Sequence, residues 1–200
     1  MANKKREPII IVLSAPSGSG KTSIVEGLMK KLGGMARSVS YTTREPREGE
    51  KNGEDYIFVL PEEFEKMKNN GEFLEWEENF GSYYGTPRKQ IEDMLNDGKD
   101  VVMCIDVKGA RKAKKEYPES ISVFIMPPSI QELENRLRRR KTDEEAQVAI
   151  RLRESRQEVA ASDEYDFLVI NNKLDEAVEE LKQVIEKERE NRTRINKKAE

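Results

Sequence analysis

Hydrophobic residues occur along the chain in short uninterrupted runs, separated by longer stretches in which they recur every three or four positions. The run from Ile9 to Leu13 contains no polar residue, which is typical of a strand buried on both faces of a parallel sheet. Further strands are predicted at 101–105, 121–126 and 167–170. Helices are predicted from about 22 to Gly33-Gly34, at 108–116, from 129 to about 140, and from 174 to about 189. Strands that alternate with helices indicate an α/β fold with a parallel sheet.

Residues 37–86 interrupt this alternation. Short alternating segments at 37–41, 56–59 and 73–77 surround one short helix near 62–67. This pattern predicts an inserted, largely antiparallel subdomain. At the other end of the chain, residues 190–200 are nearly all polar, and we expect them to fray.

The composition is that of a soluble protein, with 36% hydrophobic and 38% charged residues and no apolar run long enough to span a membrane. The absence of histidine excludes histidine acid–base catalysis and histidine metal sites, whereas phosphoryl transfer depends mainly on positioning and electrostatics.

Because Cys104 is the only cysteine, no intrachain disulfide can form, and we expect a cytoplasmic location. The net charge of −3 is unlike that of a general nucleic-acid binder, so no nucleic acid is expected as a partner. Without a spanning apolar run, no membrane is expected as a partner either.

The predicted strand at 9–13 leads into a phosphate-loop motif. Residues Ala15-Pro16-Ser17-Gly18-Ser19-Gly20-Lys21-Thr22 match G-x-x-x-x-G-K-[ST], except that Ala15 replaces the first glycine. Such glycines let backbone N–H groups surround phosphates at a helix N-terminus. Lys21 is expected to reach the β- and γ-phosphates, and the Thr22 hydroxyl to ligate Mg²⁺. The alternative is a chance glycine-rich turn, but the buried strand before it and the amphipathic helix after it favour a nucleoside triphosphate site.

Two other short motifs permit a different interpretation, a GTP-hydrolysing switch. Asp106-Val107-Lys108-Gly109 fits the D-x-x-G of such proteins, and Asn172-Lys173-Leu174-Asp175 fits their N-K-x-D guanine reader. Both follow predicted strands. A charged chain produces such short patterns easily, because Asp106 can simply end a strand and Leu174-Asp175 can begin an amphipathic helix.

A longer series of motifs resembles the guanylate kinase family. After the phosphate loop come, in order, residues 38–50, Asn52-Gly53-Glu54-Asp55-Tyr56, Phe73-Leu74-Glu75-Trp76, Tyr83-Tyr84-Gly85-Thr86, 105–109 and Pro127-Pro128-Ser129, with the spaced Arg136, Arg140 and Arg151. This resemblance implies Mg²⁺-dependent phosphorylation of GMP, and of dGMP, by ATP in purine nucleotide metabolism and GMP recycling.

The resemblance also implies a single guanylate-kinase-like domain over 1–200. Its parts are a P-loop nucleoside monophosphate kinase core with a parallel sheet (1–36, 87–128 and 165–200), an inserted GMP-binding subdomain (37–86), and a mobile helical lid with flanking helices (129–164). The implied partners are ATP and GMP, and the chain is expected to be a monomer or a homodimer.

Individual roles follow from the same resemblance. The GMP phosphate would be held by Arg44, Arg47, Tyr56 and Tyr84, and the guanine side by Ser40, Glu75, Thr86 and Asp106. The transferring group would be met by Lys21, Arg136, Arg140 and Arg151. ATP would be bound by the phosphate loop and by Asn171, as an adenine contact.

The residue types are suited to these roles, although each has a plainer alternative. Arg44 and Arg47 suit a dianionic phosphate, but could form a solvated charge cluster. Guanine presents two adjacent donors, N1–H and the 2-amino group, and one carboxylate such as that of Glu75 can accept both. The plainer alternative is that Glu75 simply faces solvent. The basic run 136–141 could be a nucleic-acid patch, yet Arg136 and Arg140 share a helix face, which favours a common phosphate target.

Two positions depart from the family pattern. Cys104 stands where the family usually has a carboxylate, on the same strand face as Asp106, which puts part of the Mg²⁺ water shell or a GMP or lid contact in doubt. Lys141 stands where a glycine is general, which affects the expected flexibility of the lid. A guanylate-kinase-like binding module without catalysis remains as an alternative, although such a module has no need of a triphosphate loop.

Overall fold

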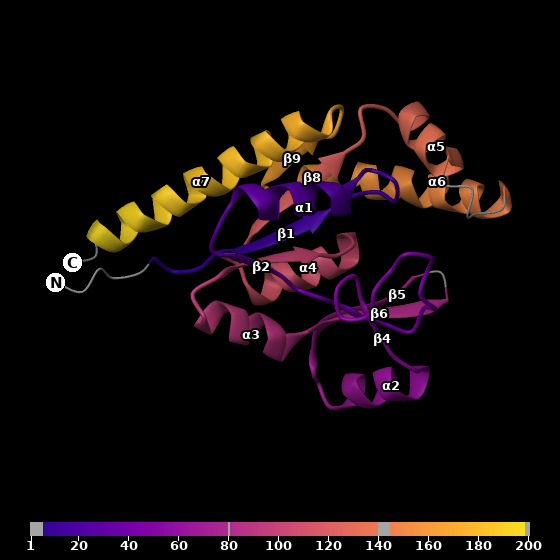
Figure 1. Cartoon of the computed structure of the whole chain (residues 1–200), viewed down its shortest axis with the longest axis horizontal. Helices are drawn as coiled ribbons and strands as arrows, with labels where there is room; N and C mark the ends of the chain where they lie inside the picture. Colours follow the sequence, from indigo (N-terminus) through magenta and orange to yellow (C-terminus); the bar gives the residue numbers. More distant parts are fainter. Residues whose placement is uncertain (1–5, 80, 140–144, 199–200) are drawn as a thin grey trace.

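The central sheet of the computed structural model, which describes residues 6–79, 81–139 and 145–198, consists of parallel strands (Figure 1). Their order is β2-β7-β1-β8-β9, and every neighbouring pair is parallel. The strands are β1 (Ile10–Ser14), β2 (Met35–Arg37), β7 (Asp100–Cys104), β8 (Ile121–Met126) and β9 (Phe167–Ile170). The predicted strands are therefore confirmed to within one residue, whereas the short β2 was not predicted as part of this sheet.

Helices cover both faces of the central sheet, which explains the uninterrupted apolar run in β1. Helices α1 (Lys21–Lys31) and α7 (Leu174–Lys198) lie over one face, and α3 (Arg88–Asn96) and α4 (Val107–Glu116) over the other. Ile11 and Leu13 pack in the core beneath α1 and α7, whereas Ile10 and Val12 pack in the core beneath α3 and α4. Since alternate side chains enter opposite cores, neither face of β1 can be polar.

A second, mixed sheet lies beside the central one. Its order is β4-β3-β6-β5, with β3 (Tyr41–Thr42), β4 (Ile57–Phe58), β5 (Phe73–Asn79) and β6 (Ser82–Pro87). The β3–β6 and β5–β6 pairs are antiparallel, and β3–β4 is parallel. The short helix α2 (Pro61–Asn69) places Phe64 against Phe73, with ring centroids 4.5 Å apart. The predicted mixture of a parallel core sheet and a separate, largely antiparallel insertion is confirmed.

The single segment predicted at 37–41 is wrong. Arg37 ends β2 in the central sheet, and Tyr41 begins β3 in the second sheet. The intervening residues connect the two sheets, so this stretch changes partners rather than forming one strand.

Two helices, α5 (Ile130–Arg139) and α6 (Glu145–Ala160), stand together at one end of the molecule, followed by the 3₁₀ turn η1 (Ser162–Glu164). Leu133, Leu137 and Val148 form a small apolar cluster between them. The N–H of Glu132 donates to the hydroxyl of Ser129 at 3.0 Å, which confirms Ser129 as the predicted helix cap. Helix α3 was not predicted, whereas α6 lies within 129–164, where the resemblance implies a helical lid with flanking helices. None of the helices in the described ranges combines the length and apolar character needed to cross a bilayer.

The C-terminal helix extends further than its local sequence predicts. We expected 190–200 to fray, but α7 continues to Lys198. Asp100, which is fully buried, accepts two hydrogen bonds of 2.6 Å from Arg6 and one of 2.8 Å from Arg189 of α7. Arg192 donates to the backbone oxygen of Glu119. The last α7 residue in the apolar core is Ile185, so these long-range contacts stabilise the polar part of the helix that follows it.

Candidate active site

The phosphate loop connects the end of β1 to the start of α1. Gly18 and Gly20 have φ of 91° and 86°, values that L side chains rarely adopt. The N–H of Ser19 donates to the carbonyl oxygen of Pro16 at 3.0 Å, which closes the turn. Lys21 is the first residue of α1, so the positive end of the helix dipole lies at the loop. The loop therefore has the backbone form that the motif predicts.

A cavity of about 490 Å³ lies between the phosphate loop, the second sheet and α6. Many of the predicted site residues line this one cavity, although they are far apart in sequence. They are Ala15, Pro16, Ser17, Gly18, Gly20, Lys21, Thr22, Ser40, Arg47, Tyr56, Glu75, Tyr84, Asp106 and Arg151.

Other predicted residues do not line the cavity. They are Ser19, Arg44, Thr86, Arg136 and Asn171, whereas Arg140 lies outside the described residues. Several of these contact lining residues: the N–H of Ser19 donates to Pro16, Thr86 donates to Glu75, and the guanidinium carbon of Arg44 lies 5.5 Å from the ring centroid of Tyr56. They can therefore support the site without facing it.

At the second-sheet end of the cavity, Glu75 is a buried carboxylate. The antiparallel register places it opposite Thr86, whose hydroxyl donates to Oε1 at 2.5 Å, and the Ser40 hydroxyl lies 3.4 Å from that of Thr86. Burial raises the pKa of Glu75 to about 7, the hydrogen bond from Thr86 lowers it, and the charge of Asp106 raises it. Glu75 is only 5% exposed, so the solvent-facing alternative is wrong. Thr86 is one donor to this carboxylate, and a base with two adjacent N–H groups can donate to it as well.

Arg44 and Arg47 lie in the loop between β3 and β4, and both contact a glutamate that was not predicted as a site residue. Nη2 of Arg44 lies 2.9 Å from each carboxylate oxygen of Glu50, which also accepts the backbone N–H of Arg47 at 2.8 Å. Glu50 itself lines the cavity. Its position three residues after Arg47 and six after Arg44 was the available signal, since a cluster of like charges needs a counterion.

Asp106 joins the first turn of α4 to the end of β5. Its Oδ1 accepts the N–H of Gly109 at 2.8 Å, and its Oδ2 accepts the side-chain amide of Asn79 at 2.6 Å. The D-x-x-G spacing is thus that of a helix cap, in which an aspartate accepts the third N–H of the helix. Asn79 was not predicted, because its contact with Asp106 depends on how α4 packs against β5.

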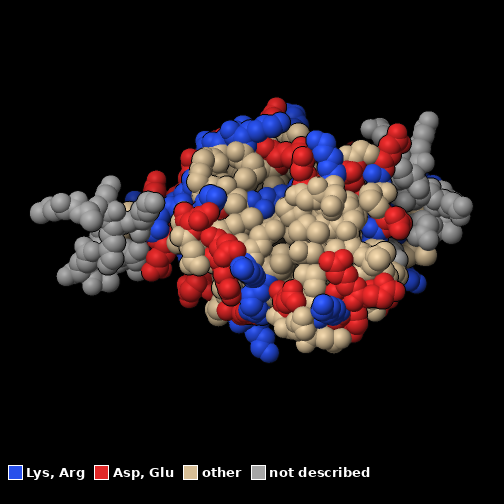
Figure 2. Space-filling view, turned by 60° about the horizontal axis from the view of Figure 1, so that its bottom comes forward, with Lys and Arg blue, Asp and Glu red and all other residues tan. Residues whose placement is uncertain are grey.

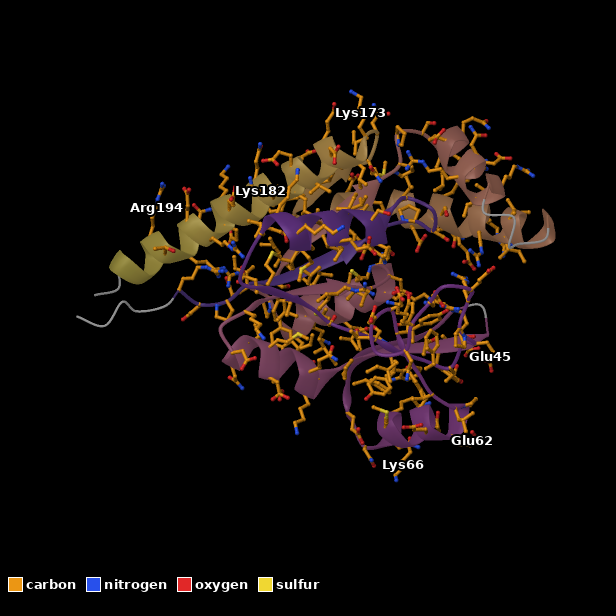
Figure 3. The ribbon with its side chains drawn as sticks, viewed as in Figure 1. Glu45, Glu62, Lys66, Lys173, Lys182 and Arg194 are labelled. Atoms are coloured by element: carbon orange, nitrogen blue, oxygen red, sulfur yellow. The ribbon has the colours of Figure 1, made fainter. Side chains whose placement is uncertain are left out.

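The N-K-x-D pattern does not form a base-binding site in this fold. Asn172, Lys173 and Asp175 are exposed at the start of α7 and do not line the cavity. Nζ of Lys173 lies 2.8 Å from Glu176, and its side chain points outward from the molecule (Figure 3). The plainer interpretation is therefore correct: these residues begin an amphipathic helix.

Helix α6 places both basic and acidic side chains in the cavity beside the phosphate loop. Arg151, Glu154 and Glu158 line the cavity, and Arg151 donates to the Ser17 hydroxyl at 3.5 Å. Burial raises the pKa of Glu158 to about 7, and the charge of Lys21 lowers it. The spacing 151, 154 and 158 is one helix face, a signal that the sequence contained but that was not used.

The basic run at the end of α5 is partly neutralised within its own helix. Arg136 lies 2.9 Å from Glu132, and Arg138 lies 2.9 Å from Glu134. On the face of the molecule shown in Figure 2, basic and acidic side chains are likewise interspersed. Such mixed charge favours a local phosphate role for the run over a uniform basic surface.

Remaining lining residues were not predicted as site residues. They include Ser23, Arg37, Ser38, Asp55, Glu77, Cys104 and Ile105. Cys104 is partly buried, and burial raises the pKa of its thiol, whereas the charges of Lys21 and Arg37 lower it.

Known proteins are similar to this chain in sequence and in fold. The family model described as guanylate kinase matches residues 6–188. The guanylate kinase of Carboxydothermus hydrogenoformans is 45% identical over 188 residues, which cover 94% of this chain and 92% of the relative. That of Thermotoga maritima is 42% identical over 191 residues, which cover 96% and 92% of the two chains.

A solved structure with the same name as both relatives is similar to this chain. The crystal structure of guanylate kinase from Anaplasma phagocytophilum has a TM-score of 0.76 and 35% identity, and the match covers 92% of this chain and 88% of that chain. The matched residues include the phosphate loop and both sheets. The chain belongs to the guanylate kinase family.

Proposed function

We propose that this protein transfers the γ-phosphoryl group of ATP to GMP, producing ADP and GDP. One observation carries the proposal: Lys21 and Thr22 of the phosphate loop line the same cavity as Glu75 and Tyr84 of the second sheet. A triphosphate at the loop and a monophosphate at the second sheet would therefore face one another. Phosphoryl transfer needs chiefly this positioning, together with cations near the transferring oxygens.

The acceptor end of the cavity is suited to guanine. Glu75 can accept the N1–H and the 2-amino group, whereas adenine would leave this buried carboxylate without donors. Ser40, Thr86 and Asp106 lie beside it as further polar groups. We assign the GMP phosphate to Arg44, Arg47, Tyr56 and Tyr84. Because this recognition uses the base and the phosphate, we also expect dGMP to be an acceptor.

The donor end is suited to Mg²⁺ held jointly by protein and nucleotide. Thr22 offers a hydroxyl at the exposed start of α1, and Lys21 lies next to it in the cavity. Within the described ranges, no group of three or more carboxylates or thiols could hold a metal ion. This fits an ion that keeps several waters and binds mainly through phosphate oxygens. When bound, Mg²⁺ neutralises charge on the β- and γ-phosphates.

Arg151 is the cation from α6 that we assign to the transferring phosphoryl group, because it already lies beside the loop at Ser17. We assign Arg136 to the same group, and Arg140 from its sequence position alone. In this proposal, residues 129–164 are the lid, 37–86 the GMP-binding subdomain, and 1–36, 87–128 and 165–200 the core. Cytoplasmic location and a monomeric or homodimeric state stay predictions.

A binding module without catalysis is the alternative from another functional class. Such a module would require only the second-sheet end of the cavity. Here Lys21, Thr22 and Arg151 also line the cavity, which favours an enzyme.

A coupled assay that follows ADP production, with ATP, Mg²⁺ and each nucleoside monophosphate in turn, tests the proposal. GMP and dGMP should be turned over, and AMP at least about tenfold to a hundredfold less efficiently, because a buried polar group left unpaired costs roughly 1–3 kcal/mol. Lys21→Ala is the control for a contaminating kinase and should be inactive. Equal turnover of AMP and GMP would contradict the assignment, and binding without turnover would favour the module.

A further inference from the structure

Asn171 follows the end of β9 and lies against the phosphate loop. It is 5% exposed, and its backbone N–H donates to the carbonyl oxygen of Met126 at 2.8 Å. Its side-chain Nδ2 donates to the carbonyl oxygen of Ser19 at 2.7 Å, in a buried position. The central sheet thus holds Asn171 from one side while its amide group holds the loop on the other.

Gly20 is fitted to the Asn171 amide group. A Cβ atom at Gly20 would lie 2.4 Å from Nδ2 of Asn171, closer than real Cβ atoms come. The positive φ of Gly20 excludes most side chains independently. The loop glycine therefore serves two purposes: it permits the turn, and it lets the Asn171 amide group approach the Ser19 carbonyl.

This hydrogen bond sets the direction of one peptide group in the loop. In a trans peptide the C=O and the N–H point in opposite directions. Because the Ser19 carbonyl points toward Asn171, the N–H of Gly20 points away from it. Gly20 lines the cavity, so its N–H becomes available to a phosphate there.

Asn171 also contacts one of the arginines from α5. Its carbonyl oxygen accepts a hydrogen bond of 3.2 Å from Arg136, whose Nε donates to Glu132 at 2.9 Å. The same residue thus contacts the loop through its side chain and Arg136 through its backbone.

We propose that Asn171 is a positioning residue of the phosphate loop, which aims the Gly20 N–H at the phosphates whatever base the nucleotide carries. The inference rests on the proposed function, since it concerns the same triphosphate site. It differs from the adenine contact that the family resemblance implies, because the side-chain amide is directed at the Ser19 carbonyl and Asn171 does not line the cavity.

Isothermal titration of the full-length protein with ADP and with inorganic tripolyphosphate, each with Mg²⁺, separates the two roles. Asn171→Ala should weaken both ligands by a similar factor, about tenfold, because each loses the same prearranged N–H. The amide resonance of Gly20 should shift when tripolyphosphate is added to the parent, and shift much less in the variant. Asn172→Ala, its exposed neighbour, is the matched control and should bind both ligands like the parent.

Loss of ADP binding with unchanged tripolyphosphate binding would overturn the proposal in favour of an adenine contact, and unchanged binding of both would overturn it outright. If Asn171→Ala does not fold, as judged by thermal melting, Asn171→Asp keeps the size and replaces the donor with an acceptor, and the same comparison applies. A parent that binds both ligands but does not phosphorylate GMP contradicts only the proposed function. A parent that binds neither overturns the phosphate site itself.

Discussion

The hydroxyl of Thr86 donates to Oε1 of Glu75 at 2.5 Å, inside a site that raises the pKa of that carboxyl to about 7 through burial. The hydrogen bond lowers the pKa, but burial and the charge of Asp106 outweigh it. The fold thus keeps a carboxylate where a neutral group would be more stable. Such a residue is expected where a ligand, rather than the protein, completes the hydrogen bonding.

Glu75→Gln should therefore raise the stability of the protein without ligand. The pKa of Glu75 is higher in the folded state than its ordinary value, so its favourable contribution is full below pH 4.5 and is lost as the pH rises through about 7. The gain from the substitution should be near zero at pH 4.5 and largest above pH 7. Thermal melting across this range measures it. Glu78→Gln, an exposed position on the same strand, should show no such pH trend; an equal trend in both variants would contradict the prediction.

The same carboxyl predicts a pH dependence of GMP binding. Since the ionised form accepts the guanine donors, protonation near pH 7 should raise the KM for GMP by roughly tenfold between pH 8 and pH 6. The phosphate of GMP also titrates near pH 6, so part of the rise belongs to the ligand. In Glu75→Gln only that part should remain. A pH profile of KM that is identical in parent and variant would remove Glu75 from guanine recognition.

Arg151 and Arg47 should affect different kinetic constants. Arg151 lies by the phosphate loop at Ser17, where a cation meets charge that spreads over the transferring oxygens, so Arg151→Ala should lower kcat at least about a hundredfold. Arg136→Ala and Arg140→Ala are expected to do the same. Arg47, beside Glu50, would hold a phosphate that is present before and during transfer, so Arg47→Ala should chiefly raise the KM for GMP, as should Arg44→Ala.

Steady-state kinetics on these variants, with melting curves to confirm folding, checks this division. A kcat of Arg151→Ala close to that of the parent would show that Arg151 is a surface charge without a role in the chemical step. A kcat effect of Arg47→Ala as large as that of Arg151→Ala would mean that both act on the chemical step.

Asp100 should be a major contributor to stability. It is fully buried and pairs with Arg6 and Arg189, so Asp100→Asn leaves two partly buried guanidinium groups without their counterion. Loss of one partner of a buried pair costs about 3–5 kcal/mol. Denaturant unfolding measures it. Asp97→Asn, which breaks the exposed pair with Lys99, should cost no more than about 1 kcal/mol, and similar losses in both variants would contradict the prediction.

Cys104→Asp should fold and keep activity, because it places a carboxylate where the family resemblance implies one. The position lines the cavity, within electrostatic reach of Lys21 and Arg37, so a carboxylate would have opposite charges nearby. Met103→Asp is the matched control, because Met103 is fully buried in the apolar core and the same substitution there should unfold the protein. A comparable loss of melting temperature in both variants would show that Cys104 is simply a buried strand residue.

Sequence alone determined the features that depend on interactions between residues close together in the chain. The apolar run at 9–13 had to be a strand with both faces covered, and Gly18 and Gly20 permit the positive φ of the phosphate loop. The cap at Ser129 depends on a residue three positions away. In each case the interacting groups are close in sequence, so their spacing predicts the structure.

Tertiary structure alone decided the features that depend on distant partners. Polar residues after 189 extend α7 because Arg189 reaches Asp100, and Asp106 bonds Asn79 because α4 packs against β5. The raised pKa of Glu75 likewise comes from burial, which no spacing of residues reveals. The sequence by itself determined which residues could bind phosphate and base. Only the packing of the two sheets decided which of them share one cavity, because the energy of a buried polar group depends on neighbours that the chain brings from elsewhere.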